Sequence, residues 1–150
     1  MKKLAELVMR AEAVVHEEEM RVLLAKLPEE CAGLTPTVIR QGFIREVRVD
    51  NRSHCDVRVR EEDGQRYTLT AKFHPKFQEA TTEITSEIFN TLWPGVRGKQ
   101  YKERYTLNNG WIVDDVKESR RGSFVVAEYE MKKGQPRVEV PETFQVRRGH

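Results

Sequence analysis

Cysteine and long apolar runs are scarce in this sequence, and both scarcities restrict what the protein can be. The two cysteines, Cys31 and Cys55, stand alone, without a paired spacing and without a nearby ladder of histidines. They therefore indicate neither a disulfide framework nor a zinc site. No apolar stretch reaches the roughly 18 residues of a membrane-spanning helix, and residues 1–16 are too charged for the apolar core of a secretion signal. We expect a cytoplasmic protein without membrane contact.

Charge of one sign is not in excess either. The 26 lysines and arginines face 24 aspartates and glutamates, which leaves a formal net charge of +2. This balance argues against binding of nucleic acid through bulk charge. Motifs of serine or cysteine nucleophiles are missing, and the histidines His16, His54, His74 and His150 show no ligand pattern. We expect these histidines to be ordinary surface or loop residues.

What is present is a chain of 150 residues, of which 38% are hydrophobic and 33% charged. This length predicts a single domain over residues 1–150 with a real core, and the charge suits a partly polar interior. An apolar stripe at helical spacing predicts a short extra helix over residues 1–15. Neither Trp93 nor Trp111 lies in a run of exposed aromatic residues, so we expect both to be packing residues.

Short alternating segments dominate the rest of the chain. Alternation of polar and apolar residues, interrupted by turn signals such as Asp63-Gly64, predicts strands joined by hairpins. Helical spacing closed by Pro94 and Gly95 predicts one short helix over residues 85–92. The predicted strands are residues 17–27, 37–49, 55–60, 67–73, 80–84, 99–107, 111–116, 124–131 and 137–140. Many short strands with few short helices indicate a mainly β fold, either an antiparallel barrel or a sandwich.

Five of these segments carry a charged side. Alternate residues of a strand share one face, so each segment places polar side chains next to one another. These side chains are Glu17, Glu19 and Arg21; Arg58 and Arg60; Thr68, Thr70 and Lys72; Lys102, Arg104 and Thr106; and Glu128 and Glu130. One interpretation is a solvated sheet face, which has the same pattern. The other is the lining of a cavity, because a sheet can close around a ligand.

A cavity lined in this way would suit a polyphosphate held together with a divalent cation. Buried charges must be paired or ligated. Arginine and lysine side chains bind phosphate oxygens, whereas carboxylates hold hard ions such as Mg²⁺ or Mn²⁺.

The order of these segments resembles the CYTH domain, or triphosphate tunnel metalloenzyme, superfamily. EEEMRVLLAKLP is similar to the Glu-x-Glu-x-Lys opening of that family. It is followed by IRQGF at 39–43, VRVR at 57–60, LTAKF at 69–73, Glu83-Ile84 before the helix, KERY at 102–105, WIVDDV at 111–116 and AEYE at 127–130. The resemblance covers roughly residues 16–144 and is greatest to small bacterial inorganic triphosphatases.

The resemblance implies an eight-stranded antiparallel β tunnel that hydrolyses inorganic triphosphate or a nucleoside triphosphate with Mg²⁺ or Mn²⁺. Family positions imply catalytic roles for Glu17, Glu19, Arg21 and Lys72. They imply phosphate binding by Arg58, Arg60, Lys72, Lys102 and Arg104, and metal binding by Glu19, Glu128, Glu130 and Asp114. An RNA 5′ triphosphate would be the one nucleic-acid partner, and the protein would be a monomer or a homodimer.

Three departures from the family pattern favour an alternative. Arg21 stands where the family usually has lysine, and the strand before the helix has Thr81 between Glu79 and Glu83, one carboxylate fewer than usual. After Phe144 the chain lacks the acidic residue and closing helix that are common there. The alternative hypothesis is a noncatalytic CYTH-like module that binds a polyphosphate, a nucleotide or an RNA 5′ end. The third hypothesis is a scaffold with a filled interior, which binds neither ligand nor metal.

Overall fold

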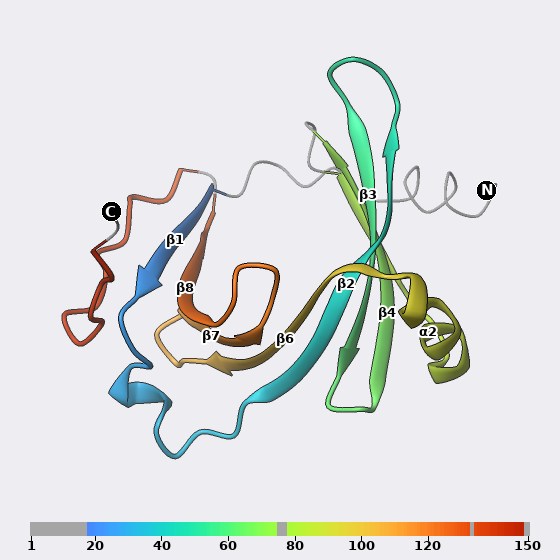
Figure 1. Ribbon diagram of the computed structural model, residues 1–150. Coiled ribbons are helices and arrows are strands. Elements are labelled where there is room, and N and C mark those ends of the chain that lie inside the picture. Colours follow the sequence, from blue (N-terminus) through green and yellow to red (C-terminus); the bar gives the residue numbers. More distant parts are fainter. Residues whose placement is uncertain (1–17, 75–77, 133, 149–150) are drawn as a thin grey trace. The chain divides into compact units, whose positions relative to one another are not determined.

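The structure is a computed structural model that describes residues 18–74, 78–132 and 134–148 (Figure 1). Eight strands, all paired antiparallel, account for most of the described chain, together with one short α-helix and two 3-10 turns. The predicted helix over residues 1–15 lies outside the described residues. Among the helices that are described, none is long and apolar enough to cross a membrane.

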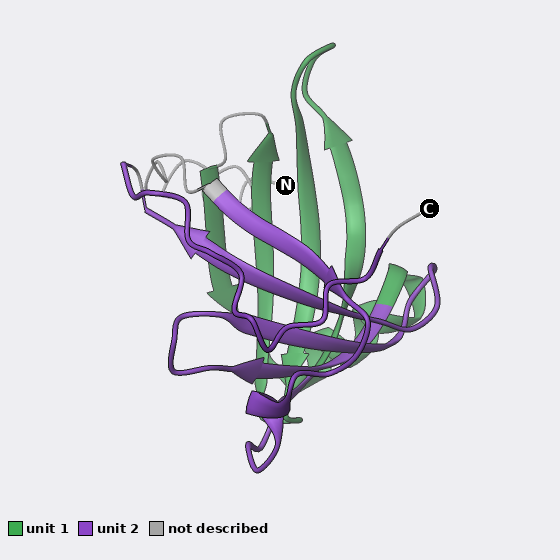
Figure 2. Cartoon of the chain, turned by 90° about the vertical axis from the view of Figure 1, so that its left-hand side faces the viewer, with its two compact units in different colours: residues 1–15, 39–99 green, residues 16–38, 100–150 purple. Residues whose placement is uncertain are grey.

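Two compact units make up the chain, and Figure 2 colours them separately. Unit 1 comprises residues 1–15 and 39–99, and unit 2 comprises residues 16–38 and 100–150. In unit 1 the strand order is β2-β3-β4-β5. Its elements are β2 (Thr37–Arg48), β3 (His54–Glu62), β4 (Arg66–His74), β5 (Gln78–Glu83), α2 (Ser86–Leu92) and the 3-10 turn η2 (Trp93–Gly95).

The β3–β4 hairpin is built on the Asp-Gly pair that the sequence analysis identified. Asp63 and Gly64 have φ angles of 52° and 64°, a conformation that glycine adopts freely and aspartate tolerates. The amide of Gln65 donates a hydrogen bond to the carbonyl of Glu62 at 2.9 Å. Gln65 adds a third loop residue, and Glu62 therefore pairs with Arg66.

One face of the unit 1 sheet is apolar, and α2 packs against it. Thr85 caps the helix by accepting a hydrogen bond from the amide of Ile88 at 3.1 Å. Phe89 is fully buried in this core and stacks on Trp93 with ring centroids 5.2 Å apart. The guanidinium of Arg40 lies 4.8 Å above the Trp93 ring. Trp93 is thus a packing residue, as predicted.

Unit 2 has the strand order β1-β8-β7-β6. Its elements are β1 (Glu18–Leu24), the 3-10 turn η1 (Glu29–Cys31), β6 (Arg97–Thr106, which begins in unit 1), β7 (Ile112–Glu118) and β8 (Phe124–Met131). Its core surrounds Trp111, which is 1% exposed. The Trp111 ring contacts Tyr129 and Phe144 at centroid distances of 5.4 and 5.5 Å. Trp111 therefore packs as predicted.

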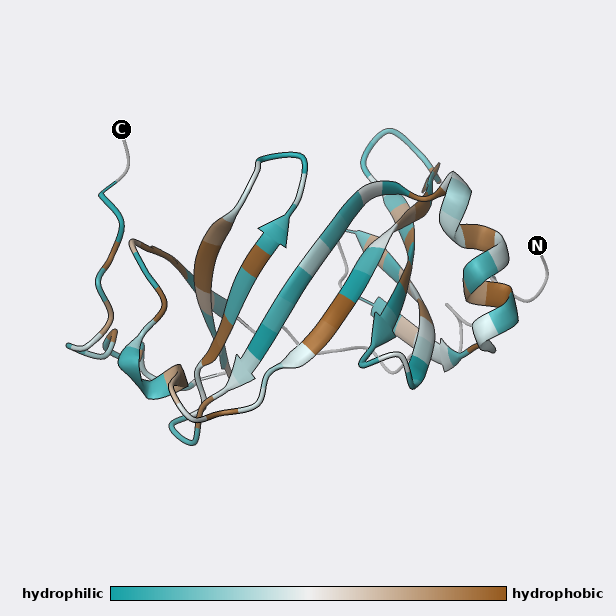
Figure 3. Cartoon of the chain, turned by 60° about the horizontal axis from the view of Figure 1, so that its bottom comes forward, coloured by the Kyte–Doolittle hydropathy of each residue, from teal (hydrophilic) through white to brown (hydrophobic). Residues whose placement is uncertain are grey.

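The predicted fold class, mainly β with eight antiparallel strands and few short helices, is confirmed. Hydrophilic and hydrophobic residues alternate along the strands, as Figure 3 shows. The strand predicted over residues 137–140 is wrong, because this segment forms no strand. Its four residues lie between two prolines, which cannot donate ladder hydrogen bonds, and Val138 and Val140 pack on the unit 2 core instead. The tunnel stays a prediction.

Gly42 on β2 is a position where unit 1 has no room for a side chain. A Cβ atom there would lie 2.3 Å from Cγ1 of Val96 and 2.9 Å from the backbone oxygen of Arg97. We expect Gly42→Ala to lower the free energy of unfolding by about 1–3 kcal/mol, since overpacking forces the backbones apart. Urea denaturation measures this loss. Gly95→Ala is the control, because a Cβ at Gly95 meets nothing within 4 Å, and an equal loss in both variants would contradict the prediction.

Candidate functional site

The four strands of unit 2 have one apolar face, which forms the core, and one polar face. Side chains of the polar face alternate with core residues along each strand. This unit 2 polar face consists of Glu19 and Arg21 of β1, Glu128 and Glu130 of β8, Asp114 of β7, and Lys102 and Arg104 of β6. Seven side chains that the sequence analysis proposed from four separate segments thus share one surface.

Asp114 is the buried centre of the basic part of this face. Its carboxylate, in a residue 2% exposed, accepts hydrogen bonds from Nε and Nη2 of Arg104 at 2.8 and 2.9 Å. Nζ of Lys102 lies 2.8 Å from Oδ2 of Asp114. Burial alone would favour the neutral acid, but the bonds from Arg104 and the charges of both cations outweigh it and hold the pKa of Asp114 below its ordinary value. Asp114 is therefore ionised and fixes two cationic side chains in place.

Glu128 is in the opposite electrostatic situation. Burial, the hydrogen bond with Glu19 and the negative charges of Glu19 and Asp114 raise the pKa of Glu128 from 4.5 to about 7. Arg21 opposes this shift only weakly, because its Nε lies 3.8 Å from Oε1 of Glu128 and its side chain is 60% exposed. Two carboxylates thus stand side by side, and Arg21 offsets little of their negative charge.

The raised pKa of Glu128 predicts a stability that depends on pH in the metal-free protein. Between pH 4.5 and about 7 the folded state holds a proton on Glu128 that the unfolded chain has released. The free energy of unfolding should therefore fall as pH rises through this window, by at most about 3 kcal/mol. Urea denaturation at pH 5 and pH 8 measures the fall. Glu128→Gln should remove most of this fall, and parallel profiles of the two proteins would contradict the prediction.

The sheet of unit 1 also has a polar face, opposite the face that α2 covers. This unit 1 polar face includes Arg58 and Arg60 of β3, Thr68, Thr70 and Lys72 of β4, and Glu79 and Thr81 of β5. A recess of about 140 Å³ lies on it, lined mainly by arginine, threonine and glutamate side chains. Nε of Arg60 donates to Gln41 at 2.9 Å. The recess thus offers cationic and hydroxyl groups to an anion.

A further cluster at the end of the same face was not predicted. Nε2 of His74 lies 2.9 Å from Oδ2 of Asp56, and Nε2 of His54 lies 3.8 Å from the same oxygen. The two imidazole rings stack with centroids 4.5 Å apart. His54 and His74 lie on strands and not in loops, and their pairing across β3 and β4 brings them together. The expectation that they are ordinary surface residues stays a prediction.

The structure places every described residue of the predicted site on one of the two polar faces. Glu19, Arg21, Lys102, Arg104, Asp114, Glu128 and Glu130 share the face of unit 2, and Arg58, Arg60 and Lys72 share that of unit 1. Glu17 lies outside the described residues. The catalytic, phosphate-binding and metal-binding roles of these side chains stay predictions.

Comparison with known proteins adds evidence at the level of the fold. No family model matches the chain, and no curated protein matches it. Among solved structures, the hypothetical protein NE1496 matches with 22% identity and a TM-score of 0.56, covering 87% of this chain and 88% of that chain. A second structure, of the inorganic triphosphatase NE1496, matches with 22% identity and a TM-score of 0.56 over 89% of this chain and 87% of that chain. The chain has the fold of this inorganic triphosphatase.

The shared fold agrees with the resemblance that the ordered motifs indicate. The comparison confirms the predicted fold alone, and membership of the CYTH, or triphosphate tunnel, superfamily stays a prediction. On this fold, the two polar faces carry the side chains of the candidate site.

Proposed function

We propose that the protein is a metal-dependent hydrolase of triphosphate, acting on inorganic triphosphate or a nucleoside triphosphate. The observation that carries this proposal is the placement of acidic and basic side chains together on the unit 2 polar face, with Glu19 and Glu128 adjacent. The fold of an inorganic triphosphatase supports it. Lys102 and Arg104 lie on the same face, so acidic and basic groups are available to a metal-bound polyphosphate.

The residues of this face fit a divalent cation. Burial and the neighbouring Glu19 raise the pKa of Glu128, and an Mg²⁺ or Mn²⁺ ion would supply positive charge there in place of a proton. Glu19, Glu128 and Glu130 would hold the ion, since carboxylate oxygens are its preferred ligands. When bound, such an ion supplies positive charge to phosphate oxygens and acidifies the attacking water.

The basic side chains bind and orient the substrate in this proposal. Asp114 positions Lys102 and Arg104 through the bonds described above. Both cations can thus stabilise negative charge as it builds on the transferred phosphoryl group.

The remaining predicted roles belong to the same proposal. Arg58, Arg60 and Lys72 are assigned to phosphate binding on the unit 1 polar face, where the recess supplies threonine hydroxyls as additional donors. Glu19 and Lys72 keep their predicted catalytic parts. Arg21 is assigned to balancing the negative charge of Glu128, which it faces across β1 and β8.

Phosphate release tests the proposal. The metal-replete protein should release phosphate from inorganic triphosphate or a nucleoside triphosphate, and a chelator should stop the release. No release from inorganic triphosphate, ATP or GTP with either Mg²⁺ or Mn²⁺ would overturn it. If calorimetry of the same preparation then showed tight binding of triphosphate without turnover, the noncatalytic binding module would replace the hydrolase. Absence of both binding and turnover would leave the scaffold hypothesis.

A further inference from the structure

The cluster of His54, Asp56 and His74 lies at one end of the unit 1 polar face, where Lys72 is the strand partner of Asp56. All three residues belong to unit 1, and none has a predicted part in triphosphate hydrolysis. We propose that they form a separate metal site for a borderline divalent transition metal of the Zn²⁺ and Co²⁺ class, with coordination positions left open to solvent.

The positions of the three donor atoms carry the proposal. Their ligand atoms all lie within 4.8 Å of one another. One oxygen, Oδ2 of Asp56, faces Nε2 of His74 at 2.9 Å and Nε2 of His54 at 3.8 Å. A tetrahedral ion with ligands at 2.0–2.2 Å places its donor atoms about 3.3 Å apart, between these two distances. Rotation of the side chains, including a turn of the stacked imidazole planes toward one point, would therefore form the site without movement of the strands.

The backbone holds the three residues in register. His54 and His74 are direct partners across β3 and β4, and Asp56 lies two residues along β3 on the same face. Before β3, the turn is closed by the carboxylate of Asp50, which accepts hydrogen bonds from the amides of Arg52 and Ser53 at 2.7 and 2.9 Å. Three ligands on paired strands need little ordering when an ion binds.

The ligand types select the class of metal. Two imidazoles and one carboxylate suit zinc and similar transition metals, whereas Mg²⁺ and Ca²⁺ prefer oxygen ligands alone. The side chains of His54, Asp56 and His74 are 37%, 25% and 25% exposed, so the ion would remain in contact with water. Such a site is open, as in catalytic metal sites, and not closed like a structural one.

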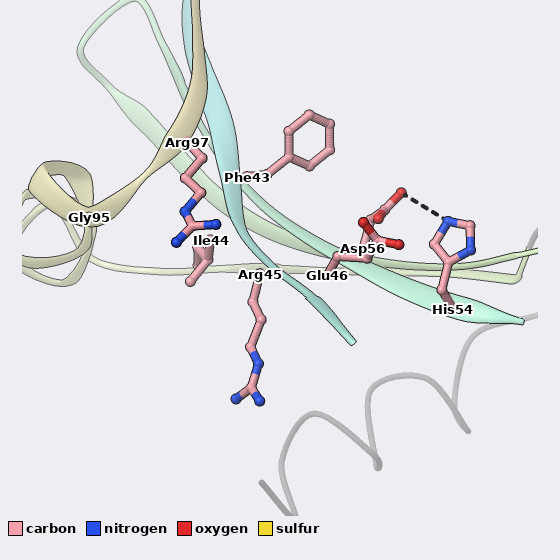
Figure 4. Close-up of a pocket in the computed structure, with 8 residues that line it drawn as sticks. All are labelled: Phe43, Ile44, Arg45, Glu46, His54, Asp56, Gly95 and Arg97. Carbon is pink, nitrogen blue, oxygen red and sulfur yellow. Dashed lines mark ion pairs between the residues drawn. The ribbon is translucent and has the colours of Figure 1, made fainter. Parts of the chain in front are cut away.

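The surroundings supply charge of both signs. His54 and Asp56 line a recess of about 730 Å³, together with Glu46 and Arg97 among others (Figure 4). Glu46 is the strand partner of Asp56 on β2, and its carboxylate adds negative charge that favours a cation. Lys72 is the partner of Asp56 on β4, and its positive charge opposes the binding of a cation. The two effects offset each other, so we expect the three ligands to decide the affinity.

Titration with Co²⁺ in a large excess of Mg²⁺ tests the proposal, because Mg²⁺ occupies sites made of oxygen alone. The visible spectrum of Co²⁺ should report one ion per chain bound to nitrogen ligands. Each of the variants His54→Asn, Asp56→Asn and His74→Asn should weaken binding at least about 10-fold, in line with the loss of one ligand of three. Zn²⁺ should displace the Co²⁺ and abolish the spectrum.

Two controls separate this site from the proposed active site. Glu87→Gln on α2 and His150→Asn remove a carboxylate and a histidine elsewhere in the sequence and should leave Co²⁺ binding unchanged. Glu128→Gln should also leave it unchanged, although it removes a proposed ligand of Mg²⁺ in unit 2. Zn²⁺ at about 100 times its dissociation constant should raise the melting temperature of the unaltered protein by about 5–10 °C and should raise that of folded His74→Asn, whose affinity is at least about 10-fold lower, by no more than about half as much. Absence of a Co²⁺ spectrum would overturn the proposal. Binding of Co²⁺ by the three ligand variants as tightly as by the unaltered protein would also overturn it.

Discussion

Replacement of Glu128 by glutamine is expected to lower the rate of phosphate release about 1000-fold. The amide keeps the shape of the side chain, but it removes one of the two negative charges that would attract the divalent ion. It also removes the group whose pKa is raised by burial and by Glu19, since an amide cannot ionise. Steady-state phosphate release at saturating Mn²⁺, with inorganic triphosphate as substrate, measures the effect.

A matched control for this variant lies on the opposite face of the same sheet. Glu103 is a half-buried glutamate of β6 whose carboxylate lies 3.5 Å from Nζ of Lys117. Glu103→Gln makes the same chemical change outside the unit 2 polar face and should keep nearly full activity. If Glu128→Gln retained the activity of Glu103→Gln, the assignment of Glu128 to the metal would be wrong.

The second large effect is expected on stability. Asp114→Asn leaves the ammonium of Lys102, whose side chain is 7% exposed, without its carboxylate partner. Breaking a buried ion pair by removal of one partner costs about 3–5 kcal/mol of unfolding free energy. Chemical denaturation of the variant and of the unaltered protein at neutral pH measures the loss.

The neighbouring residue supplies the control. Asp115 also pairs with a lysine, Lys117, at 2.8 Å, but the Lys117 side chain is 47% exposed. Solvent screens such a pair, so Asp115→Asn should cost no more than about 1 kcal/mol. The double variant Lys102→Met with Asp114→Asn should recover part of the stability lost by Asp114→Asn alone, because the uncompensated ammonium is gone. Equal losses in the two single variants would contradict the account of Asp114.

Much of the fold could be predicted because polar and apolar residues alternate along many of the strands. The segment from Phe124 to Met131 was predicted with the bounds that β8 has, since it follows a turn segment and its glutamates alternate with Ala127, Tyr129 and Met131. The same alternation placed Glu128 and Glu130 on one face of their strand. It likewise placed Lys102 and Arg104 on one face of theirs. Residues 137–140 alternate as well, but a pattern of four residues between prolines does not show whether a partner strand is available.

The pairing of charges between strands could not be predicted in the same way. Alternation shows that Arg104 and Asp114 each lie on a polar face, but only the register of β6 and β7 shows that they are direct partners. Phosphate binding was therefore expected of Arg104 without the knowledge that Asp114 engages two of its nitrogens. Sequence alone also cannot show that Glu128 is buried, which is the largest cause of its raised pKa.

The histidine cluster was missed because the predicted strands, residues 55–60 and 67–73, leave His54 and His74 outside, and because the register of the hairpin depends on one residue in its turn. A two-residue turn at Asp63 and Gly64 would pair Glu62 with Gln65 and would set His54 opposite Phe73. The third loop residue shifts the register by one, so that His54 faces His74. A one-residue slip changes the partner of every side chain in the hairpin, and the Asp-Gly signal alone does not distinguish the two turns.

The location of Mn²⁺ in crystals grown with a nonhydrolysable triphosphate analogue tests the central claim most directly. Anomalous scattering should place a Mn²⁺ ion between the carboxylates of Glu19, Glu128 and Glu130, with phosphate oxygens of the analogue in its coordination sphere. A Mn²⁺ ion and a bound analogue that both lie away from these three carboxylates would contradict the claim that they form the metal site of a triphosphate hydrolase.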